Sequence, residues 1–404
     1  MNQAVSQRVG NMLPAMAAFL SAMRNPILAE ARTRPDACDF LAGNPQEPAL
    51  PEYVATLHRW IEPRDKDWFG YKMADRRAQE VAAESLSREL GMEFSPDDIL
   101  LSRGASGGLM ACLEMLVDAG DEVIFISPPW FFYESMILRV GGVPVRVKSD
   151  APAFELPLEA IRGAITPRTR AIIVNTPNNP TGRIYGADAL ATLGTILDNA
   201  SETNGRAVYL LSDEAYSRVL FDGNRFVSPG LHYPRSMLIH TYSKSALAPG
   251  QRLGFTALNP NMPDRDEVRM AHLAVGLSAL PDALMQYALP DIDAISIDLE
   301  HLQRKRDRVV EALTEQGYEV NLPESTFYVL GRSPIPDDMD FAERLAGAGV
   351  IVLPGSAFEM PGYFRLSLTA TDAMIDRAIP HFARAIETAG AGVGGGPNDD
   401  RASI

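Results

Sequence analysis

The chain has 404 residues, of which 46% are apolar and 22% are charged, and its formal net charge at pH 7 is −15. This composition is that of an ordinary globular protein, long enough for two or three domains with a large core. The acidic balance disfavours a nucleic-acid binder and a protein held on an anionic membrane surface, because both need basic faces. We therefore expect neither nucleic-acid nor membrane partners, and we interpret the charge as a source of solubility.

The cysteines and histidines indicate a reducing compartment and no metal site. Two cysteines (Cys38 and Cys112) and six scattered histidines show neither a disulfide framework nor the spacing of metal ligands. The apolar run 12–23 contains Pro14 and lacks a small-residue cleavage site, so an amphipathic or buried N-terminal helix is the better interpretation than a signal peptide. No run reaches the roughly 18 apolar residues of a membrane span. We expect a cytoplasmic protein.

Short apolar runs alternate with helical patterns between about residues 75 and 260. Helical patterns cover, for example, 76–90 and 107–116. The runs that favour strands are 99–102, 122–127, 143–147, 170–175, 208–213 and 237–241. This alternation predicts a mostly parallel sheet covered by helices on both faces.

The C-terminal part has a different pattern. A long, highly charged helical stretch at 293–316 favours a solvated helix that links two domains. After it we expect a smaller α+β unit with helices at about 339–348 and 372–389 and strands at 318–321, 327–330, 350–353 and 363–368. The tail 390–404 is rich in Gly, Asp and Ser, which predicts disorder.

Small and aromatic residues follow the first two expected strands, where ligands of parallel α/β sheets bind. Arg103 to Gly108 opens a helix after 99–102, and small residues at a helix N-terminus suit a phosphate; the alternative is a tight turn. Trp130 lies in the aromatic run 130–133 after the next strand. Such a run is more often core than a ligand platform.

Polar side chains follow the next two strands. Thr176 to Gly182 has two prolines and two asparagines, so it is a rigid loop that can aim an amide side chain, or an ordinary Asn-Pro turn. The strand at 208–212 ends in Asp213. A carboxylate at the end of a buried strand needs a cationic partner, unless it serves as the N-cap of a following helix.

Lys244 follows the last strand of the series and is flanked by small hydroxyl residues. Buried lysines lower their pKa and then serve as Schiff-base nucleophiles. Arg252 lies eight residues further on and can supply a fixed cation. A surface loop lysine is the alternative for Lys244 taken alone.

Together and in this order, these stretches resemble class I/II aminotransferases, the aspartate-aminotransferase-like family of pyridoxal 5′-phosphate (PLP) fold type I. The similarity extends from about Leu41 to about residue 388. The matching stretches are "NTPNNPTG" at 175–182, "SDEAY" at 212–216, "TYSKS" at 241–245, "GQRLG" at 250–254 and "FRLSL" at 364–368.

The resemblance implies an α/β protein with a large domain, whose mostly parallel seven-stranded sheet is covered by helices, and a smaller α+β domain. It implies that residues 1–55 are the N-terminal segment of the small domain and that 56–292 form the large PLP-binding domain. Residues 293–389 would form the C-terminal small domain, and 390–404 a disordered tail.

The resemblance also assigns the catalytic and cofactor-binding residues. Lys244 would hold PLP as a Schiff base and, once released, act as acid and base. Asp213 would pair with the pyridine nitrogen, and Tyr216 and Asn179 would bind the phenolic oxygen. Trp130 would stack on the ring, with Phe131 or Tyr133 as alternatives. The phosphate would be held by Gly104, Ala105, Ser106, Thr241, Ser243 and Arg252.

Substrate and partner contacts follow from the same resemblance. Arg365 would bind the substrate α-carboxylate, assisted by Asn179 and the Gly43 loop. Family members are homodimers in which a tyrosine of one subunit reaches the phosphate of the other, and Tyr71 is our candidate. "WFGYKMADRR" departs from the family pattern there, and Phe69 aligns almost as well. "PESTFYVL" at 323–330 replaces the small Gly-Ala that often precedes the Phe-Tyr pair, and the effect of Ser325 or Thr326 stays open.

The function implied is a PLP-dependent aminotransferase that moves an amino group between an L-amino acid and a 2-oxo acid. The same scaffold supports β- or γ-elimination, cyclisation and oxidation of amino acids, so these alternatives stay open. A cofactor-binding regulator or inactive relative is disfavoured by the complete set of site residues. The aromatic residues near 68–71 and 130–133 permit an aromatic or aliphatic amino acid, and no second arginine for a dicarboxylate can be assigned.

Overall fold

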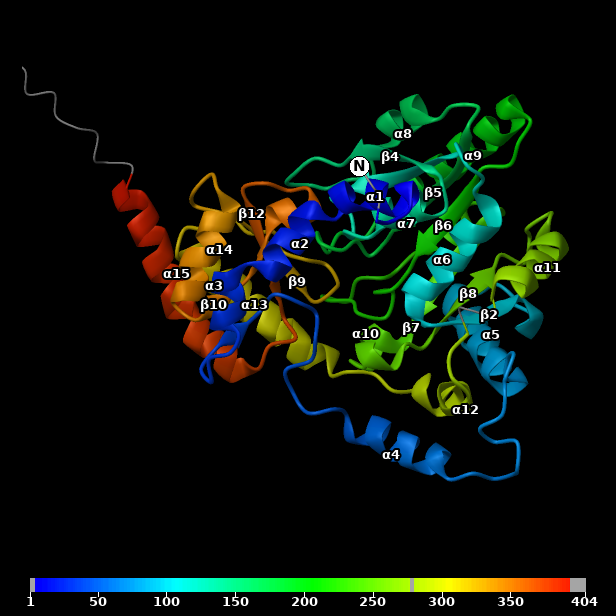
Figure 1. The fold of residues 1–404 in the computed structure, drawn as a ribbon, viewed down its shortest axis with the longest axis horizontal. Helices are drawn as coiled ribbons and strands as arrows, with labels where there is room; N and C mark the ends of the chain where they lie inside the picture. The colour runs from blue at the N-terminus through cyan, green and yellow to red at the C-terminus, as the bar shows by residue number, and fades with distance from the viewer. Residues whose placement is uncertain (1–3, 277–279, 393–404) are drawn as a thin grey trace, which may run out of the picture.

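A seven-stranded sheet forms the centre of the computed structural model, which describes residues 4–276 and 280–392 (Figure 1). The strand order is β2-β8-β7-β6-β5-β3-β4. Strand β8 is antiparallel to both β2 and β7, and the other neighbours are parallel. The expectation of a mostly parallel sheet is therefore confirmed. The strands are β2 (Ile99–Ser102), β3 (Glu122–Ser127), β4 (Val143–Lys148), β5 (Thr169–Asn175), β6 (Tyr209–Asp213), β7 (Ser236–Thr241) and β8 (Gly254–Leu258).

Helices cover both faces of this sheet, because its central strands are apolar on both sides. In β3, Ile124 belongs to one apolar cluster and its neighbour Phe125 to another, as the alternation of side chains along a strand requires. The helices of this unit are α4 (Pro51–Ile61), α5 (Arg76–Leu90), α6 (Gly104–Leu116), α7 (Tyr133–Arg139), α8 (Leu158–Ala164), α9 (Ala187–Asn204), α10 (Tyr242–Ser245), α11 (Arg265–Val275) and α12 (Ala283–Ile292).

A second unit packs at one end of the sheet and contains a three-stranded antiparallel sheet of order β11-β12-β9 (Figure 1). Strand β1 pairs in parallel with β10, so the N-terminal segment is joined to the C-terminal part. The strands are β1 (Cys38–Asp39), β9 (Tyr328–Arg332), β10 (Val350–Ile351), β11 (Leu353–Pro354) and β12 (Tyr363–Ser367). The helices are α1 (Gln7–Ala15), α2 (Ala17–Arg24), α3 (Pro26–Ala31), α13 (Leu299–Glu315), α14 (Asp338–Gly347) and α15 (Asp372–Gly392).

Three expectations for the C-terminal part need correction. The solvated helix expected at 293–316 is wrong, because α13 begins at Leu299 and its charged residues Lys305 and Arg306 are buried. The strand expected at 318–321 is wrong, since only an isolated bridge joins Val320 to Gly331. The side chain of Asn321 takes the place of a regular ladder there, because its Oδ1 accepts the Leu330 N–H at 2.9 Å. Helix α15 continues to Gly392, so the start of the tail expected at 390 is helical, and positions 393–404 lie outside the described residues. The proposed domain limits stay predictions.

The N-terminal apolar run is helical, as expected, but it is divided into α1 and α2 at Met16. No residue of α1 is buried, whereas Ala22 of α2 is, so only the first part of the run is a surface element. Helix α1 packs on α7, and α2 packs on the short helix Gly355–Phe358. Figure 1 shows α2 and α3 (blue) beside α14, so the N-terminal helices lie against both units. Among the described residues, no helix has the length and apolarity that crossing a membrane requires.

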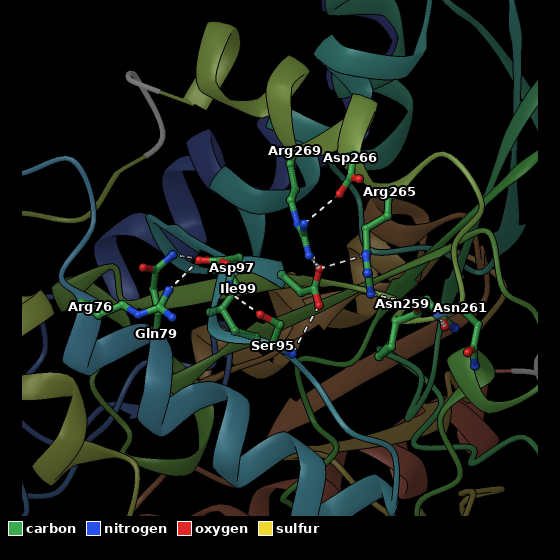
Figure 2. A network of polar contacts seen from close by, with 12 residues as sticks. Arg76, Gln79, Ser95, Asp97, Ile99, Asn259, Asn261, Arg265, Asp266 and Arg269 are labelled. Carbon is green, nitrogen blue, oxygen red and sulfur yellow. Dashed lines mark hydrogen bonds and ion pairs between the residues drawn. The ribbon is translucent and has the colours of Figure 1, made fainter.

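A buried carboxylate, Asp98, anchors the start of β2. It is fully buried, and Arg265 and Arg269 of α11 reach it, with the Arg269 Nε at 3.1 Å (Figure 2). From α5, the side chain of Gln79 donates to the Ile99 carbonyl at 2.8 Å. The network ties two helices to the strand that leads into the Arg103 to Gly108 loop, and it fixes that loop relative to the sheet.

Candidate functional site

A cavity of ≈ 120 Å³ opens where several strands of the large sheet end. Among its lining residues are ten that the sequence singled out: Ala105, Ser106, Trp130, Asn179, Asp213, Tyr216, Thr241, Ser243, Lys244 and Arg252. A larger groove of ≈ 650 Å³ runs between 151–155 and 318–322 but contains none of these residues. Chemistry, and not size, therefore identifies the site.

Parallel strand ends bring these side chains together. Asn175, Asp213 and Thr241 are the last residues of β5, β6 and β7, which are consecutive neighbours in the sheet. Asn175 also supports the loop that follows it, because its Oδ1 accepts the Asn179 N–H at 2.8 Å and its Nδ2 donates to the Asp213 carbonyl at 2.9 Å. The side chain of Asn175, the last residue of β5, thus stabilises the rigid loop that the sequence predicted.

Asp213 is 6% exposed and faces the cavity. Tyr133 donates its hydroxyl proton to Oδ2 at 2.6 Å, and the Ala215 N–H donates to Oδ1 at 3.2 Å. Burial raises the pKa of the Asp213 carboxyl, and these two hydrogen bonds offset part of the rise. A turn follows at 215–218 and no helix begins there, so the N-cap interpretation is wrong. The cationic partner that this carboxylate needs would come from a ligand.

Lys244 lies in the short helix α10, which Thr241 caps by accepting the Ser243 N–H at 3.2 Å. Its Nζ is 5.4 Å from the ring centroid of Tyr216 and 5.9 Å from that of Phe327. Within residues 4–276 and 280–392, no carboxylate forms a salt bridge with this amine. An amine at an aromatic cavity wall that is not held in a salt bridge is available for chemistry.

Arg252 marks one end of the cavity. Its backbone is left-handed, with φ 52°, and its Nη2 donates to the Ser106 Oγ at 2.8 Å. Gly104 beside it has a left-handed backbone, with φ 67°, which favours glycine, and a Cβ there would come within 2.9 Å of Nη2. Burial lowers the pKa of the guanidinium, and no described carboxylate pairs with it. With the hydroxyls of Thr241 and Ser243 close by, this end offers a site for an anion such as phosphate.

Arg365 lies behind the cavity, next to Asn179. It is 3% exposed; its Nη1 donates to the Asn179 Oδ1 at 3.0 Å and its Nη2 to the Leu41 carbonyl at 3.3 Å. Burial lowers its pKa too, its Nε has no hydrogen-bond partner, and the described residues supply no carboxylate. A buried guanidinium without a counter-charge indicates a binding site for a carboxylate ligand.

Tyr328 is a site residue that the sequence did not reveal. Its ring lies 3.9 Å from the Arg365 Cζ, and its hydroxyl accepts a hydrogen bond from Tyr216 at 3.4 Å. Burial opposes its ionisation, but the charges of Lys244 and Arg365 and the bond from Tyr216 outweigh burial and lower its pKa. The Gly43 loop leaves room for it, since a Cβ there would come within 2.5 Å of the hydroxyl oxygen.

The remaining sequence-derived residues lie away from the cavity of this chain. Tyr71 and Phe69 are on the surface, with exposures of 112% and 64%, and neither lines the cavity. Ser325 donates its hydroxyl to the Val219 carbonyl. Thr326 has a left-handed backbone with φ 75°, and its Oγ1 accepts the Tyr328 N–H at 3.2 Å. This "PEST" turn therefore acts on the site indirectly, by presenting Tyr328.

The arrangement fits PLP. A phosphate matches the uncompensated cation Arg252, and a protonated ring nitrogen matches the buried Asp213. An aldehyde matches the free amine of Lys244, and the ring face matches Trp130, which lines the same cavity. The second uncompensated cation, Arg365, remains for a substrate carboxylate.

Comparison with known proteins points the same way. Residues 62–382 match the family model described as aminotransferase class I and II. The chain is 33% identical over 395 residues to the aspartate/prephenate aminotransferase of Thermus thermophilus, covering 95% of this chain and 98% of that protein. It is 32% identical over 329 residues to an aspartate aminotransferase of Rhizobium meliloti, covering 75% of this chain and 78% of that protein.

Solved structures agree in fold. An aminotransferase from Eubacterium rectale superposes with a TM-score of 0.87 at 26% identity, covering 96% of this chain and 99% of the other. The Thermus thermophilus aspartate aminotransferase with maleate superposes with a TM-score of 0.82 at 30% identity, covering 95% and 100%.

Proposed function

Since this chain belongs to the aminotransferase class I and II family and is a PLP-dependent aminotransferase, we propose that the cavity beside Lys244 is where the amino group of an L-amino acid is passed to a 2-oxo acid. One observation carries this proposal. A free amine, a buried carboxylate and one guanidinium line a single cavity, and a second guanidinium without a carboxylate partner lies directly behind Asn179 in its wall.

The residues around the cavity have distinct tasks in holding the cofactor. When bound, PLP supplies an aldehyde that condenses with amines and a ring that withdraws electrons from the substrate. Asp213 would keep a proton on the ring nitrogen, and Trp130 would cover the ring face. Tyr216 would turn its single hydroxyl proton from Tyr328 to the ring oxygen. The Nδ2 of Asn179 would donate to the same oxygen, since the Asn179 Oδ1 is occupied by Arg365. The phosphate would lie among Ala105, Ser106, Thr241, Ser243 and Arg252, with Gly104 giving the room.

Lys244 would hold the cofactor aldehyde and then move the proton at the substrate α-carbon. Its place beside aromatic rings and outside any salt bridge supports this role, because the amine is free to approach the substrate. Arg365 would bind the α-carboxylate through its planar fork, with Gly43 and Asn179 beside it. These two groups fix the reacting carbon between them.

We further propose a cytoplasmic homodimer with an active site shared between subunits. An exposed apolar strip, Phe69, Tyr71 and Met73, supports this, because a partner subunit would cover it. Tyr71 would reach the partner's phosphate, with Phe69 as the alternative. Sedimentation of the purified protein should give the mass of two chains, and Tyr71→Ala should weaken PLP binding; a monomer with full PLP affinity contradicts both statements.

The direct test follows the visible absorbance of the PLP-loaded protein. Adding a suitable amino acid should abolish the absorbance of the bound aldehyde form, and a 2-oxo acid should restore it. Lys244→Ala should lower kcat by a factor of about 10⁴ or more, while PLP can still bind non-covalently. Lys148→Ala is the matched control, since Lys148 is a surface lysine paired with Asp150, and it should be fully active.

Two outcomes would redirect the assignment. If no amino acid in a broad panel changes the absorbance, the transamination proposal fails. Release of ammonia without any 2-oxo acid would instead indicate an elimination reaction on the same cofactor scaffold.

A further inference from the structure

The described residues of this chain offer the cavity no further cation for a second carboxylate. In the part of the chain that the structure describes, its cationic groups are Lys244, Arg252 and, behind Asn179, Arg365. In the proposed function they serve the aldehyde, the phosphate and the α-carboxylate, respectively. A dicarboxylic amino acid would bring one more charge, and desolvating that charge without a partner is unfavourable.

A continuous set of aromatic rings leads out of the cavity instead. We call Phe19, Trp130, Phe131 and Phe132 the aromatic wall. Trp130 lines the cavity, and its ring lies 5.0 Å from that of Phe132 in an edge-on contact. Phe131 stacks on Phe19 of α2 with ring centroids 4.1 Å apart and planes 16° apart. The N-terminal helix α2 thus completes a wall that begins at the cofactor site.

A further ring lies at the carboxylate end. The Phe358 ring centroid is 5.9 Å from the Arg365 Cζ, and Phe358 belongs to an apolar cluster against which Phe131 packs. Phe131 and Phe132 are only half-buried, so parts of their faces are open beside Trp130. Aromatic rings therefore lie at both ends of the site, Trp130 at the cofactor and Phe358 at Arg365.

The charged residues around Glu134, which follows the aromatic run in the sequence, carry an excess of negative charge. Arg146 is bound by two carboxylates, Glu134 of α7 and Glu359, each at 2.6 Å. Glu359 also accepts the hydroxyl proton of Ser127, which precedes the Trp130 loop, at 2.8 Å. One guanidinium between two carboxylates leaves an excess negative charge that disfavours a further carboxylate.

We propose that the amino donor has a large apolar side chain that lies along the aromatic wall, and that aspartate and glutamate are poor donors. This inference rests on the proposed aminotransferase function and narrows its substrate class. Apolar and aromatic side chains gain from burial against half-exposed rings. Several relatives are named aspartate aminotransferases, and that name describes the amino donor of those proteins. The amino donor of this chain is inferred from its own cavity.

The test compares single-turnover rates of the PLP-loaded protein with phenylalanine, leucine, aspartate and glutamate. We expect the second-order rate constant of phenylalanine or leucine to exceed both dicarboxylate values by about tenfold or more. Unreactive ligands give a second measurement by calorimetry, in which 3-phenylpropionate should bind about tenfold more tightly than succinate. Faster reaction of aspartate or glutamate, or tighter binding of succinate, would overturn the substrate class while the aminotransferase proposal stands. If none of the amino acids reacts with the PLP-loaded protein, the proposed function itself is contradicted.

The variant Phe131→Ala tests the wall itself. It should raise the half-saturating phenylalanine concentration by about tenfold and leave the values for alanine unchanged, because a methyl side chain does not reach the wall. Phe226→Ala removes a half-buried ring elsewhere on the surface and should change neither value. An unchanged phenylalanine value in a folded Phe131→Ala protein would contradict the proposal. Should that variant fail to fold, the calorimetric pair on the unmodified protein still decides.

Discussion

The two ends of the active-site cavity each have an arginine without a carboxylate partner, but the two arginines are held differently. Arg252 is partly open to solvent, and it donates hydrogen bonds within the large-sheet unit, to the Pro249 carbonyl and the Ser106 hydroxyl. Arg365 is almost fully buried and is joined to two distant segments, through Asn179 and the Leu41 carbonyl. The phosphate end is thus a local structure of the large sheet, whereas the carboxylate end is an assembly of both units.

This difference separates the two binding tasks. The phosphate end can form from one unit alone and suits a cofactor that stays bound. The carboxylate end depends on how the second unit packs against the sheet, which suits a substrate that enters and leaves. The predictions below are expected to change one end and spare the other.

The largest effect is expected at the carboxylate end. Arg365→Ala should lower kcat/KM for amino acids by about 10²- to 10³-fold, because a buried bidentate contact with the α-carboxylate is lost. The dissociation constant of PLP should be nearly unchanged. Titration of the Arg365→Ala protein with PLP, followed by steady-state kinetics, measures both quantities. A marked loss of PLP affinity in Arg365→Ala would contradict the distinction between the two ends.

The reverse pattern is expected for Arg252. Arg252→Ala should raise the dissociation constant of PLP about tenfold to a hundredfold, since it removes the cation that faces the phosphate. At saturating PLP, KM for the amino acid should change little. Fluorescence titration of the cofactor-free protein measures the first quantity. Arg59→Ala, which removes an exposed arginine paired with Asp291, is the control and should bind PLP normally.

Tyr133 supports Asp213, the carboxylate that lines the cavity between the two ends. Tyr133→Phe should lower the free energy of unfolding of the cofactor-free protein by about 1–3 kcal/mol at pH 7, because the buried Asp213 carboxylate loses its donor. The pKa of Asp213 is raised by burial, so its ionisation destabilises the fold as pH rises through that pKa, and the penalty of Tyr133→Phe should shrink towards acid pH, where the carboxyl is protonated.

Urea unfolding at several pH values tests this dependence. The matched control is Tyr185→Phe, since Tyr185 is buried but its hydroxyl has no hydrogen bond among the described residues. A penalty for Tyr133→Phe that grew in acid would contradict the role of Asp213.

The smallest effect is expected for Tyr328, which joins the carboxylate end to Tyr216. Tyr328→Phe keeps the ring under Arg365 and removes only the hydroxyl that accepts from Tyr216. We expect kcat to fall about threefold to tenfold, with KM for the amino acid nearly constant. The pH dependence of kcat should also shift, because the charge of Lys244 lowers the pKa of this hydroxyl and the two groups therefore titrate together. A change in KM alone would place Tyr328 with Arg365 and not with Tyr216.

The sequence predicted the lining of the cavity because strand ends are visible in it. A buried strand followed by Asp213 or Lys244 places that residue at the sheet edge whatever the rest of the fold does. Strand β8 was missed because it begins at Gly254, and its return beside β7 is antiparallel and needs no crossover helix. The pattern of strands alternating with helices contains no signal for it.

Contacts that depend on tertiary structure were not predictable in the same way. Tyr133 was assigned to an aromatic run and given as an alternative to Trp130, whereas its hydrogen bond to Asp213 depends on how α7 begins after the loop. Tyr328 comes to Arg365 through the pairing of β9 with β12 and the left-handed Thr326. Such partners are distant in sequence and leave no periodic pattern. The aromatic wall is a further case, because Phe19 meets Phe131 only through the packing of the N-terminal helices.

The pairing of β1 with β10 has a consequence for the order in which the protein matures. Strand β1 leaves the ribosome early, but its partner is translated only after the whole large sheet, so β1 must wait for it. The strands of the large sheet, and with them the surroundings of Arg252, can assemble during synthesis. A nascent chain would therefore acquire its phosphate pocket before its carboxylate pocket, because Arg365 of β12 is itself translated after all the strands around Arg252.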